Sequence, residues 1–201
     1  NQIALRTLET DWLAPARERY QRVWLGGISL GGLVAMAHVA ARPGVAAGLC
    51  LLAPYPGSRP STNVIERAGG PDRWRPTEKD LRDPELRVWQ WLQRPPADLP
   101  VFIGHGSDDR FADRIQQVAD RFPPASRHTV KGGHDWAAWL PLWEKFLDSP
   151  CVAFGASPLE GGRHQGPGKA GSPVSLGGVT SRVAGRATPE TTPETHTKSE
   201  T

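Results

Sequence analysis

Residues 23–32 read Val-Trp-Leu-Gly-Gly-Ile-Ser-Leu-Gly-Gly, and this stretch decides the fold. An apolar run typical of a buried strand leads into a G-x-S-x-G pattern at residues 27–31, and good helix formers follow directly. A serine on a sharp turn from strand to helix is held in a strained conformation with its hydroxyl exposed, and small neighbours let the two backbones approach closely. The sequence therefore predicts a strand over 23–28, a helix over 30–42 and an exposed, reactive Ser29 between them.

Strand and helix patterns alternate along the chain to about residue 150. Apolar runs predict further strands, and 3.6-residue periodicity predicts further helices. The expected strands cover 45–53, 101–104 and 127–130, and the expected helices cover 1–20 (ended or interrupted by Pro15), 112–122 and 136–147. This order predicts an α/β domain over residues 1–150, with a parallel sheet and helices on both of its faces.

Residues 57–98 break the alternation, because they are rich in proline, arginine, aspartate and tryptophan, with only short helical stretches expected at 63–68 and 83–93. An insert after a strand of such a sheet is typical of a small cap over the carboxyl ends of the strands. Its tryptophans, Trp74, Trp89 and Trp91, either line an apolar pocket or pack the cap onto the sheet, and the sequence leaves both open. The spacing of Trp136, Trp139 and Trp143 predicts that they pack the last helix against the core.

Residues 151–201 differ in character from the domain, being dominated by glycine, proline, serine, threonine and glutamate. Such a segment cannot bury enough apolar surface to offset the entropy of ordering it. We expect a low-complexity, disordered tail.

Composition excludes several classes of partner. The 201-residue chain has a net charge of only +3, and its charges are interleaved, so we expect no nucleic-acid partner. It has no apolar stretch of membrane-spanning length and no signal-peptide pattern at its start, which predicts no membrane partner and a cytoplasmic location. Of its two cysteines, Cys50 lies in an apolar run, so a disulfide framework is not expected.

A serine hydroxyl becomes a nucleophile only with a base in hydrogen-bond reach, and the base needs an orienting carboxylate. Downstream of Ser29, the loop after the strand at 101–104 carries Asp108 and Asp109. Asp109 is the preferred acid and Asp108 the second choice, although a turn or helix-capping role would explain either alone. The loop after the strand at 127–130 carries Gly132 and Gly133, which let His134 bend back over the sheet.

The other five histidines fit the role of base less well. His38 lies within a helix, His105 ends a strand before the candidate acid, and His128 lies in a strand. His164 and His196 lie in the tail. Only His134 combines a suitable loop with the chain order serine, aspartate, histidine.

Three motifs, LGGISLGG (25–32), GHGSDDRF (104–111) and GGHDWAAW (132–139), together resemble the α/β-hydrolase superfamily over roughly residues 20–148. The last two look like bacterial carboxylesterase-type serine hydrolases. The resemblance implies Ser29 as nucleophile, His134 as base and Asp109 as acid, with the Leu30 backbone N–H as an oxyanion donor. It also implies a small ester substrate, and no metal or cofactor.

The chain departs from that pattern at its front, where the resemblance implies several strands before residue 23 and a loop with a second oxyanion donor. Only about twenty residues precede the serine strand, so we expect an N-terminally truncated hydrolase fold. The serine strand then lies at an open sheet edge, which favours self-association. A serine esterase is the leading hypothesis. A thioesterase, amidase or acyltransferase with the same residues, or an inactive or impaired fragment, are the alternatives.

Overall fold

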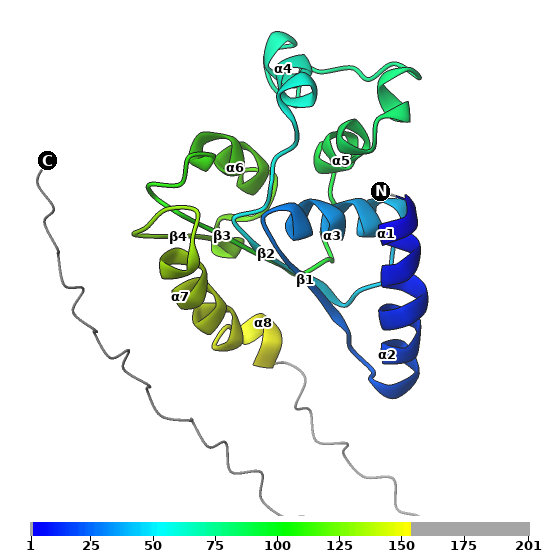
Figure 1. Cartoon of the computed structure of the whole chain (residues 1–201), viewed down its shortest axis with the longest axis vertical. Coiled ribbons are helices and arrows are strands. Elements are labelled where there is room, and N and C mark those ends of the chain that lie inside the picture. Colours follow the sequence, from blue (N-terminus) through cyan, green and yellow to red (C-terminus); the bar gives the residue numbers. More distant parts are fainter. Residues whose placement is uncertain (1, 154–201) are drawn as a thin grey trace, which may run out of the picture. The chain divides into compact units, whose positions relative to one another are not determined.

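The computed structural model describes residues 2–153, which form a four-stranded parallel sheet with helices on both faces (Figure 1). The strand order is β1-β2-β3-β4. The strands are β1 (Trp24–Ile28), β2 (Gly48–Leu52), β3 (Val101–Gly106) and β4 (Arg127–Val130). The predicted α/β class and the order of the strands are confirmed, and β1 lies at an edge of the sheet as expected. Residues 151–153 of the predicted tail are helical, contrary to expectation, and the rest of that tail, from position 154, lies outside the described residues.

The helices follow the predicted order, with one short addition at the end. They are α1 (Gln2–Thr7), α2 (Ala14–Arg19), α3 (Leu30–Ala41), α4 (Arg59–Arg67), α5 (Pro84–Leu92), α6 (Ala112–Ala119), α7 (Trp136–Leu147) and α8 (Pro150–Ala153), with a π-helical turn at Leu8–Leu13 and 3₁₀ turns at Asp80–Arg82 and Pro124–Ser126. Within residues 2–153, none of these helices has both the length and the apolar character needed to span a bilayer.

The two faces of the sheet are covered by different helices, with α3 and α6 on one face and α7 on the other (Figure 1). All five residues of β2 are buried, as expected for a central strand of a parallel sheet. Its side chains alternate, so that Leu49 and Leu51 join the core under α3, while Cys50 and Leu52 join the core under α7. Because successive side chains of a strand point to opposite faces of the sheet, the apolar residues of β2 are divided between two cores.

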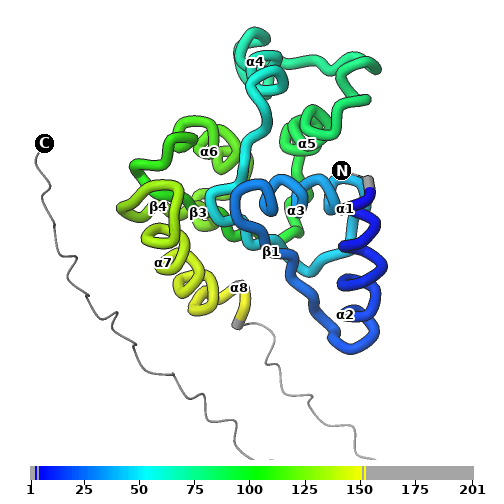
Figure 2. The backbone as a smooth tube through the Cα atoms, viewed as in Figure 1, coloured from blue at the N-terminus to red at the C-terminus, as the bar shows by residue number. Residues whose placement is uncertain are grey.

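The N-terminal helical run continues through Pro15, so the prediction that this residue ends or interrupts the helix was wrong in part. Proline stands in the first turn of α2, and the turn before it widens to π-helical geometry, in which the Ala14 N–H donates to the Glu9 carbonyl. The run lies beside α3 (Figure 2). There Glu9 bonds the buried His38, with 2.9 Å between Oε2 and Nε2, and also pairs with Arg17.

The insert packs onto the domain through its tryptophans, which decides between the two roles left open for them. Trp74 and Trp89 are buried in the main core, and the Trp89 indole N–H donates to the Pro56 carbonyl over 2.9 Å. Trp91 is partly buried against the same core and contacts the ring of Phe122.

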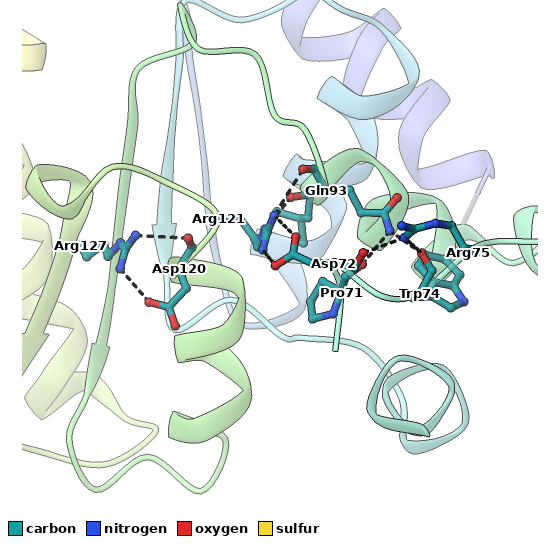
Figure 3. Close-up of polar contacts among 9 residues, drawn as sticks. Pro71, Asp72, Trp74, Arg75, Gln93, Asp120, Arg121 and Arg127 are labelled. Atoms are coloured by element: carbon teal, nitrogen blue, oxygen red, sulfur yellow. Dashed lines mark hydrogen bonds and ion pairs between the residues drawn. The ribbon is translucent and has the colours of Figure 1, made fainter. Parts of the chain in front are cut away.

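Polar contacts tie the insert to the C-terminal end of α6 (Figure 3). The Arg121 guanidinium donates to both carboxylate oxygens of Asp72, at 2.7 and 3.0 Å, and to the backbone carbonyls of Leu92 and Gln93. The Gln93 side chain in turn donates to the carbonyls of Pro71 and Trp74. One arginine therefore fastens two parts of the insert, the loop at Asp72 and the end of α5.

The tryptophans of α7 do not pack as predicted. The residues that this helix buries are Ala138, Leu142 and Phe146, whereas Trp136 and Trp143 are exposed and Trp139 is half-buried. Because the spacings of the two sets are equally helical, periodicity alone does not say which stripe faces the sheet.

The turn between β1 and α3 depends on two glycines. A Cβ atom at Gly27 would overlap the backbone carbonyl of Gly31, and one at Gly32 would lie 2.7 Å from the Pro54 Cβ. Gly31, the second glycine of the G-x-S-x-G pattern, has open space where a Cβ would stand. The close approach of strand and helix therefore requires Gly27 and Gly32, but not Gly31.

We predict that Gly27→Ala destabilises the fold by roughly 1–3 kcal/mol or more, because the neighbouring atoms are backbone and cannot repack. The matched control, Gly31→Ala, should leave the stability unchanged or raise it by up to about 1 kcal/mol, since alanine favours helix over glycine. Urea unfolding followed by circular dichroism measures both, and equal effects of the two substitutions would contradict the prediction.

Candidate active site

Ser29 occupies a strained backbone conformation at the carboxyl end of β1. Its φ of 51° and ψ of −118° are outside the regions that most side chains adopt. Such a residue costs about 1–3 kcal/mol and persists only where its surroundings hold it. Here the Ser29 N–H donates to the Leu52 carbonyl over 3.0 Å, and the Ser29 carbonyl accepts from the N–H groups of Gly32 and Tyr55 at 2.9 and 2.8 Å.

The three residues predicted for a nucleophile, a base and an acid lie in one hydrogen-bonded row. The Ser29 hydroxyl oxygen is 2.9 Å from Nε2 of His134, and Nδ1 of His134 is 2.6 Å from Oδ2 of Asp109. Ser29 and His134 are 105 positions apart in sequence, and Asp109 and His134 are 25 positions apart. Each of the three residues follows a different strand of the sheet. Both ring nitrogens are therefore engaged, one by a hydroxyl and the other by a carboxylate.

Of the two candidate acids, only Asp109 meets His134. Its side chain is fully buried, and its other oxygen, Oδ1, accepts the Phe111 backbone N–H over 2.8 Å. Asp108 instead extends outward to Lys131, with 2.7 Å between Oδ2 and Nζ. That lysine lowers the pKa of the Asp108 carboxyl below its usual range, chiefly through a hydrogen bond.

Backbone bonds join the loop that carries Asp109 to the loop that carries His134. The Ser107 N–H donates to the Val130 carbonyl over 2.7 Å, and the Asp108 N–H donates to the Gly132 carbonyl over 2.8 Å. A side chain at Gly106 would overlap the carbonyls of Gly132 and Gly133, so the loops meet this closely only because glycine stands there. This junction sets the distance between the His134 ring and the Asp109 carboxylate.

Two aromatic rings hold the imidazole of His134 from different elements. The centroid of Phe111 lies 5.4 Å from that of the imidazole at an interplanar angle of 84°, and the centroid of Trp139 lies 5.3 Å away at 88°. Edge-to-face contacts of this kind are favourable and restrict ring rotation. Neither Phe111 nor Trp139 was predicted as a site residue, although both belong to the motifs that carry Asp109 and His134.

Leu30 begins α3 immediately after Ser29. The backbone N–H groups of the first helical turn have no acceptor within the helix, and the helix dipole places partial positive charge there. The Leu30 N–H, predicted as an oxyanion donor, therefore belongs to a set of donors suited to an anion beside the Ser29 hydroxyl.

The other described histidines are packed elsewhere. His38 pairs with Glu9, and the ring of His128 stacks on Phe102 with 4.2 Å between centroids. His105 is buried at the end of β3, where burial lowers its pKa and the Asp109 carboxylate opposes that shift in part. Among residues 2–153 there is no cluster of three or more histidine, cysteine, aspartate or glutamate side chains arranged to hold a metal ion.

Comparison with known proteins gives a structural likeness and no match in sequence. No protein-family model matches the chain, and no curated protein matches it in sequence. Among chains of known structure that match, one described as a ferulic acid esterase has a TM-score of 0.48 and 16% sequence identity, over 71% of this chain and 58% of that chain. The chain thus spans just over half the length of that esterase. Membership of the α/β-hydrolase superfamily stays a prediction, and the chemistry of the site is inferred from its own geometry.

Burial of His105 predicts that the fold loses stability in acid. Because its pKa is lower in the folded chain than in the unfolded chain, the unfolded form binds more protons as the pH falls through about 6.5. His105→Gln should therefore reduce the loss in the free energy of unfolding between pH 7 and pH 5, measured by urea titration. His128, whose pKa is also lowered by burial, should act in the same direction. A variant with both His105 and His128 replaced by glutamine should therefore lose still less free energy of unfolding between pH 7 and pH 5. An unchanged pH dependence in both variants would contradict this account.

Proposed function

We propose that this chain is a serine hydrolase that cleaves carboxylic esters through an acyl-serine intermediate. The row of hydrogen bonds from Ser29 through His134 to Asp109 carries the proposal, because it joins a hydroxyl to a base and the base to a buried carboxylate. The strained turn at Ser29 supports it, since strain of this kind is concentrated at functional sites.

In the first half of the reaction, the Ser29 hydroxyl oxygen attacks the ester carbonyl carbon while Nε2 of His134 takes its proton. Asp109 stabilises the imidazolium that forms, through the bond at Nδ1. The Leu30 N–H donates to the oxyanion of the tetrahedral intermediate. As the intermediate collapses, the bond to the alkoxy group breaks, and Nε2 returns the proton to the leaving alcohol.

In the second half, His134 accepts a proton from water as the water oxygen attacks the acyl carbon. The second tetrahedral intermediate expels the Ser29 oxygen, which regains its proton from Nε2, and a carboxylic acid leaves. The side chains of this cycle supply every proton transfer, so the proposal includes no metal or cofactor. The same residues would serve a thioesterase, amidase or acyltransferase, because they do not select the leaving group or the acceptor.

Labelling with a fluorophosphonate probe tests whether Ser29 is a reactive nucleophile. We expect stoichiometric labelling of the folded chain, and mass spectrometry should locate the probe on the peptide that contains Ser29. The Ser29→Ala variant should not be labelled. The matched control is Ser107→Ala, which removes an exposed hydroxyl from the adjoining Asp109 loop and should label like the unmodified chain.

A folded chain that takes up no probe would overturn the proposal in favour of an inactive fragment with a hydrolase fold. Labelling that persists in Ser29→Ala would show that another residue reacts. Measuring kcat/KM for p-nitrophenyl acetate and for a matching thioester then shows whether the chain prefers an alcohol or a thiol as the leaving group.

The two neighbouring aspartates provide a matched pair for the acid. Asp109→Asn should lower kcat for ester hydrolysis by roughly 10³–10⁴-fold, because an amide favours the wrong tautomer of His134. Asp108→Asn should change kcat less than about threefold, since the ion pair that it breaks is exposed to solvent. Steady-state kinetics on one ester measures both, and similar losses would show that Asp109 has no special role.

A further inference from the structure

We propose that Tyr55 is a positioning residue for the hydrogen-bonded row of Ser29, His134 and Asp109, to which it adds a contact from the segment after β2. Its backbone bonds the nucleophile, and its ring supports the base through Phe111. This inference rests on the proposed function, because it assigns a further residue to the same site. Tyr55 lies in none of the three motifs that carry Ser29, Asp109 and His134.

The backbone of Tyr55 helps to hold Ser29 in its strained conformation. The Tyr55 N–H donates to the Ser29 carbonyl over 2.8 Å, and the Leu52 carbonyl accepts the Ser29 N–H over 3.0 Å. A residue with a φ of 51° persists only where its surroundings fix it. The end of β2 and the segment after it therefore engage both backbone polar groups of the nucleophile.

The ring of Tyr55 reaches the other half of the row through Phe111. The two rings meet edge to face, with 5.7 Å between centroids and an interplanar angle of 82°. Phe111 in turn contacts the His134 imidazole, with 5.4 Å between centroids, and its N–H donates to Oδ1 of Asp109 over 2.8 Å. Tyr55 thus packs on a residue that contacts both the base and the acid. Because edge-to-face contacts favour one relative orientation, a fixed Tyr55 ring limits the movement of Phe111 and hence of the imidazole.

Tyr55 is suited to this role because its own backbone has little freedom. It stands between Pro54 and Pro56. A proline fixes its own φ and confines the residue before it to extended conformations, so Tyr55 loses little entropy when the fold holds it. Its side chain is half-buried against the main core. Among the described residues its hydroxyl forms no hydrogen bond, so the ring rather than the hydroxyl carries the contact.

The insert fixes the segment that follows Tyr55. The Trp89 indole N–H donates to the Pro56 carbonyl over 2.9 Å, and Trp89 itself is buried. Glu85, in the first turn of α5, accepts the backbone N–H of Ser58 over 2.8 Å and its hydroxyl over 2.7 Å. This segment is therefore held at both ends, by the nucleophile at its start and by α5 at its end.

Steady-state kinetics on p-nitrophenyl acetate separates positioning from simple packing. Tyr55→Leu removes the ring and should lower kcat about 10–100-fold, because a misplacement of the base by about 1 Å costs up to roughly 100-fold. KM should change less than about threefold, since the loss falls on the transition state rather than on substrate binding. Tyr55→Phe keeps the ring and should have a kcat within about twofold of that of the unmodified chain.

A proton NMR signal of the chain gives a readout that does not need turnover. The proton between Nδ1 of His134 and Oδ2 of Asp109 should resonate at low field, as expected for a short hydrogen bond to a carboxylate. Tyr55→Leu should broaden this signal or shift it to higher field, whereas Tyr55→Phe should leave it in place. The matched control is Tyr20→Leu, which replaces the chain's other tyrosine at an exposed position and should change neither the signal nor kcat.

Circular dichroism establishes that each variant is folded, and Tyr55→Met, which keeps much of the apolar volume without a ring, replaces Tyr55→Leu if that variant unfolds. An unchanged kcat and an unchanged His134 signal in a folded variant without the ring would overturn the proposal, as would an equal loss of kcat in Tyr55→Phe. If the unmodified chain hydrolyses no ester, the proposed function fails, and the His134 signal of the variants still decides whether Tyr55 positions the imidazole.

Discussion

The close approach of the β1 and α3 backbones is the constraint on which the rest of the structure depends. Gly27 lies against the Gly31 carbonyl, and Gly32 lies against Pro54, so strand and helix meet without side chains between them. This contact forces Ser29 into its strained conformation and presents its hydroxyl at the carboxyl end of the sheet. A parallel sheet brings the loops after β3 and β4 to the same edge, where the residues that meet the hydroxyl are found.

A second close backbone approach, between Gly106 and the Gly132 carbonyl, also leaves no room for a side chain, and it lies between the loops that carry Asp109 and His134. The backbone bonds around it fix the Asp109 loop against the His134 loop, and the rings of Phe111 and Trp139 then limit how the imidazole can turn. The geometry of the site is therefore set mainly by backbone contacts and packed rings. The exposed ion pair of Asp108 with Lys131 adds little to it.

The exposed face of α7 and the candidate site meet in one side chain. Trp139 contacts the His134 ring on one side and the exposed Trp136 on the other, with 5.3 and 5.4 Å between ring centroids. Trp139 therefore links the exposed end of α7 to the imidazole of His134.

The sequence by itself determined the order of strands and helices, the turn at Ser29, and the chain order of Ser29, Asp109 and His134. Those features depend on apolar periodicity and turn chemistry, which act between residues close in sequence. Only the tertiary structure decided that Asp109 rather than Asp108 faces His134, that Gly27 rather than Gly31 must be glycine, and that Trp89 is buried whereas Trp136 is exposed. Each choice lies between residues with similar local patterns. What separates them is the approach of another strand, loop or helix from far along the chain, and local periodicity carries no information about that approach.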